Sequence, residues 1–442
     1  MADLKARTTE EVVGPLDPDE AVQEANRCLY CYDAPCIQGC PTHIDIPVFI
    51  RGIATGHLKG AARTILDANI LGATCARVCP TEALCEGACV VGKHQRPVSI
   101  GRLQRHATDW LAQRGEQLFT PGSPTGRRVA IVGAGPAGLG CAFELRRAGH
   151  AVVMFESRPE AGGLDTYGIV SYRLPVAVSR WEVEQVRAMG AEIRTGVTVG
   201  RDVAFADLVR DYDAVFLAVG LRPGPKLGIP GEDLAGVYDA LDLIERHKRD
   251  QYEGVELGDR VAVIGAGNTA VDAATLAVRM GAAEVMILYR RSEAEMTAYR
   301  YEYEFAKEEG VHYHFLTAPT RILGEGRVTG IECVRQTLGE PDERGRRTSA
   351  PVPGSEHVFQ VTSVIRAIGQ AHPGQLWESW GLEHRGGRLV VDPATMRTSH
   401  PRVFAGGDAS GLTRDVTVVD AVEQGKRAAH AMAAALGEGE VA

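Results

Sequence analysis

The segment Val129–Gly138, VAIVGAGPAG, joins a short apolar run to the pattern Gly133-x-Gly135-x-x-Gly138. The run is predicted to be a buried strand, and the residues after it have the apolar spacing of a helix. The first glycine makes a tight turn, the second lets the backbone approach a pyrophosphate, and the third lets the helix pack closely. The amino end of the helix also attracts phosphate. The segment therefore predicts a dinucleotide-binding α/β fold.

The residues after this helix support the same prediction. The next apolar strand, VVMFE, ends at Glu156, where a carboxylate is expected to bind a ribose. Gly162 and Gly163 follow and permit a second close approach of the backbone. A strand, a glycine turn, a helix and an acid in this order favour a nucleotide site over a structural turn.

A second unit of the same design begins with the strand VAVI and the motif Gly265-Ala-Gly267-Asn-Thr-Ala270. The strand that should end in an acid ends instead at Arg290 and Arg291. Two guanidinium groups without a carboxylate favour a ribose that carries a 2′-phosphate. NADPH is therefore the predicted nicotinamide. NADH stays possible if the arginines only end a strand at the surface.

Eight of the ten cysteines lie in two groups near the start of the chain. Such dense thiolates ahead of two nucleotide motifs indicate iron–sulfur electron transfer, with two clusters as the natural number. Structural zinc is the alternative. Disulfides are not expected, because no signal peptide is evident near Met1 and the cytosol keeps thiols reduced. Cys141 and Cys333 are predicted core residues. The groups are Cys28, Cys31, Cys36 and Cys40, then Cys75, Cys79, Cys85 and Cys89.

Further apolar runs define the domain layout. Residues 214–220 and 364–369 end in glycine, and residues 403–408, VFAGGD, are typical of a strand that brings backbone and a carboxylate to the flavin end of FAD. The FAD domain is therefore predicted to be split by the NAD(P) domain. The predicted class is α/β: a helical iron–sulfur domain followed by two Rossmann-like domains. The expected ranges are 1–120 for the helical domain with two 4Fe–4S clusters, 127–250 and 373–442 for FAD, and 255–372 for NAD(P).

Composition excludes several classes of protein. The chain has 442 residues, 45% of them hydrophobic, and a net charge of −9, which gives no basic footprint for nucleic acid. No apolar run approaches the roughly 20 residues that cross a bilayer. We therefore expect a cytoplasmic protein with no membrane or nucleic-acid partner.

The chain resembles the flavin subunit of bacterial NAD(P)H-dependent dihydropyrimidine dehydrogenase, and it is also similar to the small subunit of bacterial glutamate synthase. The motifs that carry the resemblance to the former are CLYCYDAPC at 28–36, CPTHIDI at 40–46, GATCARVCPTEALC at 72–85 and SIGRLQRHA at 99–107.

The resemblance implies ligands residue by residue. Eight thiolates would be the simple guess for two clusters, but the family pattern makes Cys75 a bystander and uses the side chain of Gln104 instead. One cluster would be held by Cys28, Cys31, Cys36 and Cys89, and the other by Cys40, Cys79, Cys85 and Gln104. FAD would contact Gly133, Gly135, Ala137, Glu156, Gly163, Leu164, Arg173, Gly407, Asp408 and Thr417. NADPH would contact Gly267, Asn268, Thr269, Arg290 and Arg291.

Two departures from the family pattern stand out. Thr297 occupies a position where relatives can place another phosphate-binding arginine, which weakens the preference for NADPH. Val170 replaces a common proline, with little consequence expected.

The resemblance also implies the activity. Nicotinamide delivers two electrons together and a cluster accepts one, so a flavin must stand between them; no protein acid or base is needed. The expected partner is an FMN-containing catalytic subunit that reduces uracil or thymine. The alternatives are the small subunit of glutamate synthase, an NAD(P)H:ferredoxin-type oxidoreductase, or a non-catalytic assembly subunit. No C-x-x-C follows the first glycine motif, so disulfide reduction is not expected.

Overall fold

The computed structural model describes residues 9–341, 347–412 and 417–437, which form two compact units. One unit comprises residues up to Glu11, Tyr167–Tyr172 and Arg222–Ala371. The other comprises Val12–Thr166, Arg173–Leu221 and His372–Ala442. We call them the nucleotide unit and the flavin unit.

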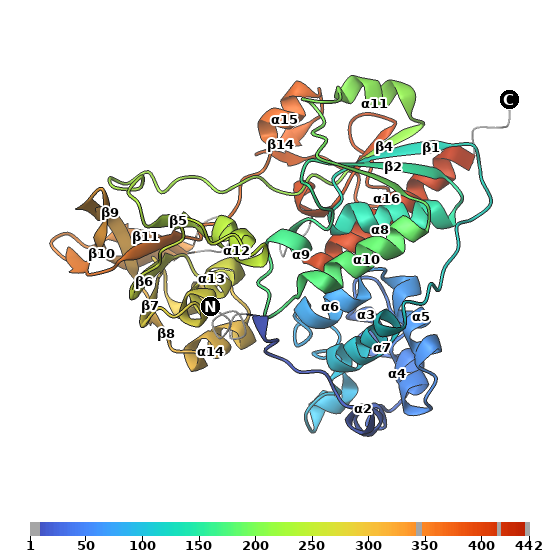
Figure 1. The fold of residues 1–442 in the computed structure, drawn as a ribbon, viewed down its shortest axis with the longest axis horizontal. Coiled ribbons are helices and arrows are strands. Elements are labelled where there is room, and N and C mark those ends of the chain that lie inside the picture. Colours follow the sequence, from blue (N-terminus) through green and yellow to red (C-terminus); the bar gives the residue numbers. More distant parts are fainter. Residues whose placement is uncertain (1–8, 342–346, 413–416, 438–442) are drawn as a thin grey trace. The chain divides into compact units, whose positions relative to one another are not determined.

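The flavin unit begins with a helical domain, blue to cyan in Figure 1. The apolar spacing at 47–70 predicts a helix pair, and the structure has α4 (Ile46–Ala54) and α5 (Leu58–Ala68) there, with their apolar faces buried. The buried side of α7 (Ile100–Arg114) packs against α5 and α6. The other helices are α2 (Pro18–Ala25), α3 (Pro35–Gln38), α6 (Gly72–Val78) and the 3₁₀ turn η1 (Val90–Lys93). Both cysteine groups therefore lie on or between short helices.

A five-stranded parallel sheet follows in the order β16-β4-β1-β2-β3. Helices α8 (Pro136–Arg147), α10 (Val176–Ala188) and α16 (Val418–Gly437) lie on one side of it, and α11 (Phe205–Asp211) lies on the other (Figure 1). The strands are β1 (Arg128–Val132), β2 (Ala151–Glu156), β3 (Glu192–Thr195), β4 (Ala214–Leu217) and β16 (Val403–Ala405). The last strand comes from the end of the chain, so the flavin sheet is split as predicted.

The nucleotide unit has its own five-stranded parallel sheet, in the order β5-β13-β6-β7-β8. Its helices are α12 (Ala240–Lys248), α13 (Asn268–Arg279) and α14 (Arg300–Glu308). The strands are β5 (Val237–Asp239), β6 (Arg260–Ile264), β7 (Glu284–Leu288), β8 (Val311–His314) and β13 (Ser363–Arg366). Two copies of one supersecondary design are thus present, as the repeated glycine motif predicts.

The first boundary of this unit differs from the expected one. The expected end of the first FAD segment is residue 250, but Arg222 already belongs to the nucleotide unit. The reason is strand pairing, because Val237 lies opposite Val364 on β13 and not in the flavin sheet. The three-residue strand β5 has too few residues to show a pattern in the sequence.

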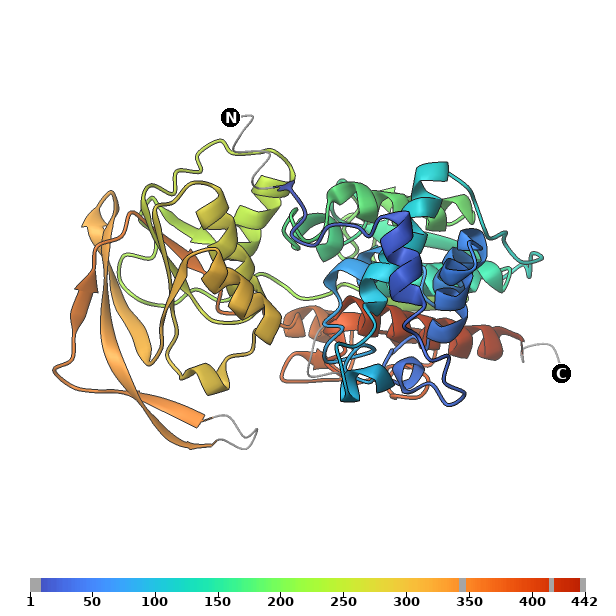
Figure 2. The ribbon, with the colours of Figure 1, turned by 90° about the horizontal axis from the view of Figure 1, so that it is seen from below.

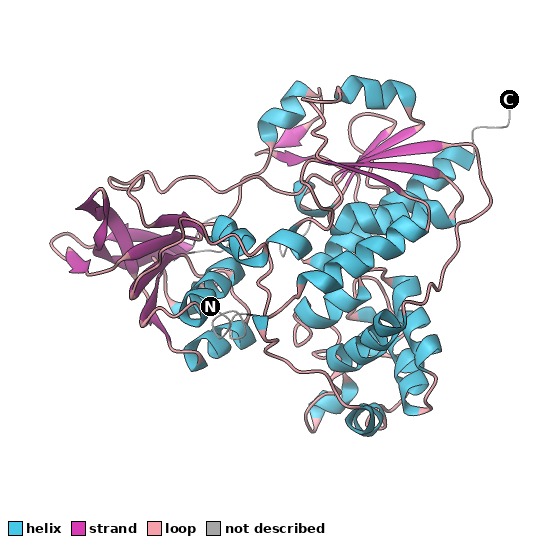
Figure 3. Cartoon of the chain, viewed as in Figure 1, coloured by secondary structure: helices cyan, strands magenta, loops and turns pink. Residues whose placement is uncertain are grey.

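An antiparallel sheet was not predicted. β10 (Arg327–Pro341) pairs with β9 (Thr317–Glu325), β11 (Arg347–Pro351) and β12 (His357–Phe359). Figure 2 shows these strands, in orange, beside the parallel strands of the same unit, and Figure 3 separates strands from helices throughout. Within the described ranges, we find no helix with the length and apolarity needed to cross a membrane.

Candidate functional site

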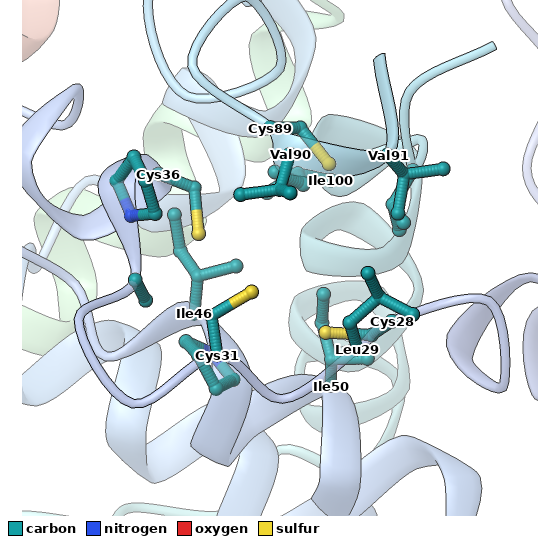
Figure 4. Close-up of a pocket in the computed structure, with 14 residues that line it drawn as sticks. Cys28, Leu29, Cys31, Cys36, Ile46, Ile50, Cys89, Val90, Val91 and Ile100 are labelled. Carbon is teal, nitrogen blue, oxygen red and sulfur yellow. The ribbon is translucent and has the colours of Figure 1, made fainter. Parts of the chain in front are cut away.

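Four cysteines line one cavity in the helical domain (Figure 4). Cys28 and Cys31 lie on the loop after α2, Cys36 lies in α3, and Cys89 precedes η1. The sulfur atoms point into the space between these segments. The remaining wall is mostly apolar and includes Ile46, Ile50, Val91, Val98 and Ile100.

The electrostatics of this cavity disfavour ionised thiols without a cation. Burial, then the neighbouring Cys28 and Cys89, raise the pKa of Cys36 to about 11. Burial also raises the pKa of Cys28, with Cys31 and Cys89 adding to the shift. Several thiolates around one space need positive charge to hold them together, which a metal centre supplies. The donor set therefore fits an iron–sulfur cluster.

The second set of predicted ligands also comes together. Cys40 follows α3, Cys79 ends α6, and Cys85 lies in the loop after it. Burial raises the pKa of Cys85 well above its ordinary value, and Cys79, Glu86 and Cys40 add to the shift. The structure thus places Cys79 and Cys40 within electrostatic reach of Cys85.

Gln104 lies on the buried face of α7, beside helix α6. Its Nε2 donates a hydrogen bond to the carbonyl oxygen of Gly72, 2.7 Å away. The amide oxygen, which carries the lone pairs of the group, would be the atom that binds iron. Cys75, the predicted bystander, is buried in α6 and accepts a hydrogen bond from Asn69 Nδ2 at 3.2 Å.

The first glycine motif forms the turn between β1 and α8. Gly133 has φ +100°, and a Cβ there would lie 2.3 Å from the carbonyl oxygen of Ala218, so other residues are excluded. At Gly135 a Cβ would meet only the Cα of Gly163, at 3.6 Å. The space above Gly135 is therefore open, as the approach of a pyrophosphate requires.

Glu156 is held at the end of β2 by the backbone. One carboxylate oxygen accepts the N–H of Ala134 at 2.9 Å, and the other accepts the N–H of Arg158 at 2.8 Å. Each oxygen can accept a further hydrogen bond. The carboxylate is thus pre-oriented beside the glycine turn, where it can accept hydroxyl groups of a ribose.

The C-terminal residues predicted to bind FAD lie beside the helix that follows the first glycine motif. A Cβ at Gly407 would lie 3.1 Å from the Cβ of Ala137, although 270 residues separate the two in sequence. Gln424 Oε1, on α16, accepts the N–H of Gly407 at 2.9 Å and so holds this turn. Nothing in the local sequence pattern around Gln424 marks it as part of this site. Thr417 lies directly before α16, and its Oγ1 accepts the N–H of Asp420 in the first turn of that helix.

Three further predicted FAD residues lie around this site. Half-buried Asp408 follows β16, and burial raises its pKa to about 6. Leu164 is 38% exposed and begins the short helix α9 (Leu164–Tyr167) directly after Gly163. Arg173 lies near Glu82, whose pKa burial raises and this arginine lowers. Glu82 lies between Cys79 and Cys85 in the sequence, so Arg173 lies near the second cysteine group.

The predicted NAD(P) residues are also brought together in part. Asn268 begins α13, next to Thr269, and its Oδ1 accepts the N–H of Tyr299 at 3.1 Å. A Cβ at Gly267 would lie 3.3 Å from Thr297 Oγ1. The segment after β7 therefore folds over the second glycine turn.

The two arginines after β7 differ from each other. Arg290 is exposed, whereas Arg291 Nε donates to the carbonyl oxygen of Arg347 on β11 at 2.8 Å. Arg290 is therefore the more available of the pair for a phosphate.

All ten cysteines are free thiols. Cys141 and Cys333 are fully buried, in α8 and β10. Burial, then Glu144, raises the pKa of Cys141 well above its ordinary value, and burial, then Glu332, raises that of Cys333 to about 12. Neither has the exposed, ionised character of a redox thiol.

Two protein-family models cover almost the whole chain. The model described as pyridine nucleotide-disulphide oxidoreductase matches residues 127–435. The model described as dihydropyrimidine dehydrogenase domain II, 4Fe-4S cluster, matches residues 5–116.

Several proteins of named function are similar to this chain in sequence. The formate dehydrogenase (NADP⁺-dependent) subunit beta of Moorella thermoacetica is 41% identical over 90% of this chain, which spans 59% of that protein's length. The glutamate synthase [NADPH] small chain of Halomonas elongata is 39% identical, with 97% of this chain and 93% of that one covered. The NAD-dependent dihydropyrimidine dehydrogenase subunit PreT of Salmonella typhimurium is 34% identical, with 96% of each covered.

Solved structures share the fold of the two nucleotide-binding domains. Mycobacterium tuberculosis FprA in complex with NADPH has a TM-score of 0.60 at 21% identity, over 71% of this chain and 85% of that one. T. acidophilum thioredoxin reductase has a TM-score of 0.55 at 22% identity, over 70% and 99%.

Fold, cysteine groups and comparisons together define an NAD(P)H-dependent flavin oxidoreductase with FAD and 4Fe–4S clusters. The chain belongs to the pyridine nucleotide-disulphide oxidoreductase family, and it carries the 4Fe–4S domain of dihydropyrimidine dehydrogenase ahead of the family's nucleotide-binding domains. The predicted cofactors and fold class are confirmed. The resemblance holds for the group of families that includes PreT and the glutamate synthase small chain.

Proposed function

We propose that this chain is the electron-input subunit of a larger enzyme. It would accept hydride from NAD(P)H and pass single electrons to a partner protein. The observation that carries the proposal is the cysteine-lined cavity, together with the second group of neighbouring thiols, in the same unit as the first glycine turn.

The residues of this chain have distinct tasks in that proposal. Gly135 leaves open space that the FAD pyrophosphate would occupy, and Glu156, held by the N–H of Ala134, would accept the ribose hydroxyls. Cys28, Cys31, Cys36 and Cys89 would hold one cluster, and Cys40, Cys79, Cys85 and Gln104 the other. When bound, FAD exchanges electrons in pairs with nicotinamide and singly with iron–sulfur clusters.

The surface around the first cavity supports electron exit at that point. Tyr32, next to Cys31, is fully exposed, and Val48, next to the cavity residue Pro47, is 52% exposed. Leu29 lines the cavity and is itself 63% exposed. Exposed apolar groups at the mouth of a redox site suit contact with a partner protein.

The first candidate partner is an FMN-containing subunit that reduces uracil or thymine to dihydropyrimidines. It is supported by the family description of residues 5–116 and by the PreT relative. The second candidate is the large subunit of glutamate synthase. Identities of 39% and 38% to two glutamate synthase small chains, against 34% to PreT, favour it.

Identification of the native partner tests the proposal. The tagged chain is purified anaerobically from its own host, and NAD(P)H oxidation is measured with uracil or with glutamine plus 2-oxoglutarate. Uracil-dependent oxidation by the complex supports the first candidate, and glutamate formation supports the second. If the purified chain contains neither flavin nor iron and does not oxidise NAD(P)H, the proposal is contradicted. A non-catalytic assembly role would then explain the chain.

A further inference from the structure

A carboxylate that no cofactor assignment uses lies between the flavin fold and the second cysteine group. Glu182, on α10, has no exposed surface. Its Oε1 accepts the N–H groups of Ala73 and Thr74 at 2.8 and 2.9 Å, and its Oε2 accepts the hydroxyl of Thr74. The carboxylate therefore binds the first turn of α6, the helix that ends at Cys79.

A single peptide group connects this carboxylate to Gln104. The N–H of Ala73 donates to Glu182, and the carbonyl of the same peptide, that of Gly72, accepts Gln104 Nε2 at 2.7 Å. Hydrogen bonds in such a chain polarise one another in a low-dielectric interior. An anionic Glu182 thus makes the Gly72 oxygen a better acceptor, and this in turn makes the Gln104 amide oxygen a better donor to iron.

We propose that Glu182 is a positioning residue for the second cluster: through the Gly72–Ala73 peptide it orients the Gln104 amide, and its negative charge lowers the potential of that cluster. The inference rests on the proposed ligand set. Both effects of the charge have the same sign, because a stronger ligand and a nearby anion each stabilise the oxidised cluster.

The charge of Glu182 depends on pH in the physiological range. Burial raises its pKa to about 7, while the hydrogen bonds from α6 and the charge of Arg77 act in the opposite direction. Arg77, on α6, is itself paired with Asp109 on α7 at 2.8 Å, and Cys75 on α6 lies within electrostatic reach. The reduction potential of the second cluster should therefore fall as pH rises through about 7. At low pH, the protein with the reduced cluster carries one proton on Glu182, which is taken from water.

The test is a redox titration of the holoprotein followed by EPR at pH 6 and pH 8. Glu182→Gln keeps the shape and the acceptor oxygen but removes the charge. We expect the second cluster of this variant to have a more positive potential at pH 8 and to lose its dependence on pH, with the first cluster unchanged. Glu184→Gln, on the same helix but exposed, is the matched control and should behave as wild type.

A second variant keeps the inference testable if Glu182→Gln folds poorly. Thr74→Val removes one donor to the carboxylate, so the pH at which the potential changes should move upward. Equal potentials and equal pH dependence in wild type, Glu182→Gln and Thr74→Val would overturn the inference. Gln104→Ala distinguishes failure of the ligand set from failure of the role of Glu182. If Gln104→Ala leaves both EPR signals unaltered, the ligand set is wrong. If it alters one signal while Glu182→Gln alters none, only the role of Glu182 is wrong.

Discussion

Cys75 and Gln104 determine the composition of the proposed ligand set of the second cluster. Cys75 belongs to a cysteine group, yet its sulfur is buried and accepts a hydrogen bond from Asn69, whereas Gln104, on the next helix, donates to Gly72. A count of thiols alone predicts eight thiolate ligands, whereas the proposed set has seven thiolates and one amide.

The first prediction tests this set. The holoprotein should contain about eight irons and eight sulfides per chain, from two 4Fe–4S clusters. Cys75→Ser should retain all of them, because its hydroxyl can still accept from Asn69, and Cys28→Ser should lose about half. Iron and acid-labile sulfide analysis after anaerobic purification measures both. Loss of iron in Cys75→Ser with full retention in Cys28→Ser would reverse the assignment.

The second prediction concerns Glu182 and stability. Its pKa is raised from 4.5 to about 7, so the native state binds the proton more tightly than the unfolded chain does. Its stabilising contribution is full below pH 4.5 and is lost as pH rises through 7, and 2.5 pKa units correspond to about 3 kcal/mol. The difference in melting temperature, wild type minus Glu182→Gln, should therefore decrease between pH 5.5 and pH 8. A difference that stays constant with pH, as expected for Glu184→Gln, would contradict the raised pKa.

The third prediction concerns the two arginines after β7. Neutralising both, Arg290→Gln with Arg291→Gln, should raise KM for NADPH far more than for NADH, since each lost charged hydrogen bond to phosphate costs about 1.5–3 kcal/mol. Arg290→Gln alone should account for most of the change, because Arg291 also binds the backbone of Arg347. Arg321→Gln, an exposed arginine on β9, serves as control. An unchanged ratio of the two KM values in the double variant would assign both arginines to the surface.

At the scale of the element, contact between α8 and α16 joins the two separated parts of the FAD domain. A Cβ at Gly425 on α16 would lie 2.1 Å from the carbonyl oxygen of Ala137 on α8, and a Cβ at Gly140 would lie 3.0 Å from that of Val422. The helices can approach this closely because both positions are glycine.

The fourth prediction follows from this contact. Gly425→Val should separate the helices, destabilise the protein by about 1–3 kcal/mol and release FAD, because Ala137 and Gly407 then move apart. Gly437→Ala, at the end of the same helix with open space around it, should leave both properties unchanged. Melting temperature and the flavin-to-protein absorbance ratio provide the comparison. Full flavin retention in Gly425→Val would show that the contact does not hold the site.

At the scale of the whole molecule, the fifth prediction concerns electron output. The purified chain should oxidise NAD(P)H with an artificial dye but should not reduce uracil or thymine. Two nucleotide-binding folds and the helical domain account for almost all described residues, so we expect the pyrimidine site to lie on the partner subunit. Anaerobic assays with dye, with uracil, and with uracil plus the partner subunit measure this. Rapid uracil-dependent oxidation of NAD(P)H by the chain alone would contradict the assignment of pyrimidine reduction to a partner subunit.

A surface variant controls the same experiment. Tyr32→Ser combined with Val48→Ser removes exposed apolar groups beside the first cavity without touching the thiols. The partner-dependent rate should fall while dye reduction remains at the wild-type level. Val352→Ser, an exposed apolar residue on the nucleotide unit, should leave both rates intact.

Much of this architecture follows from local patterns in the sequence. Alternation of apolar strands with glycine turns and helices predicted both parallel sheets, because each turn has steric requirements that only a few residues meet. The cysteine spacing predicted iron–sulfur chemistry, and the terminal strand at 403–405 predicted a split flavin domain. Each of these features lies within a segment of about ten residues, so the residues involved are close together in the sequence.

Other features arise from contacts between segments that are far apart. The strand at 237–239 joins the nucleotide sheet through Val364, Gln424 holds Gly407, and Glu182 reaches the start of α6 across 108 residues. Burial and hydrogen-bond partners, and therefore the raised pKa of Glu182, exist only once these segments pack together. A linear pattern records which side chains are available, and the packed chain decides which of them share a dielectric environment and a hydrogen-bond network.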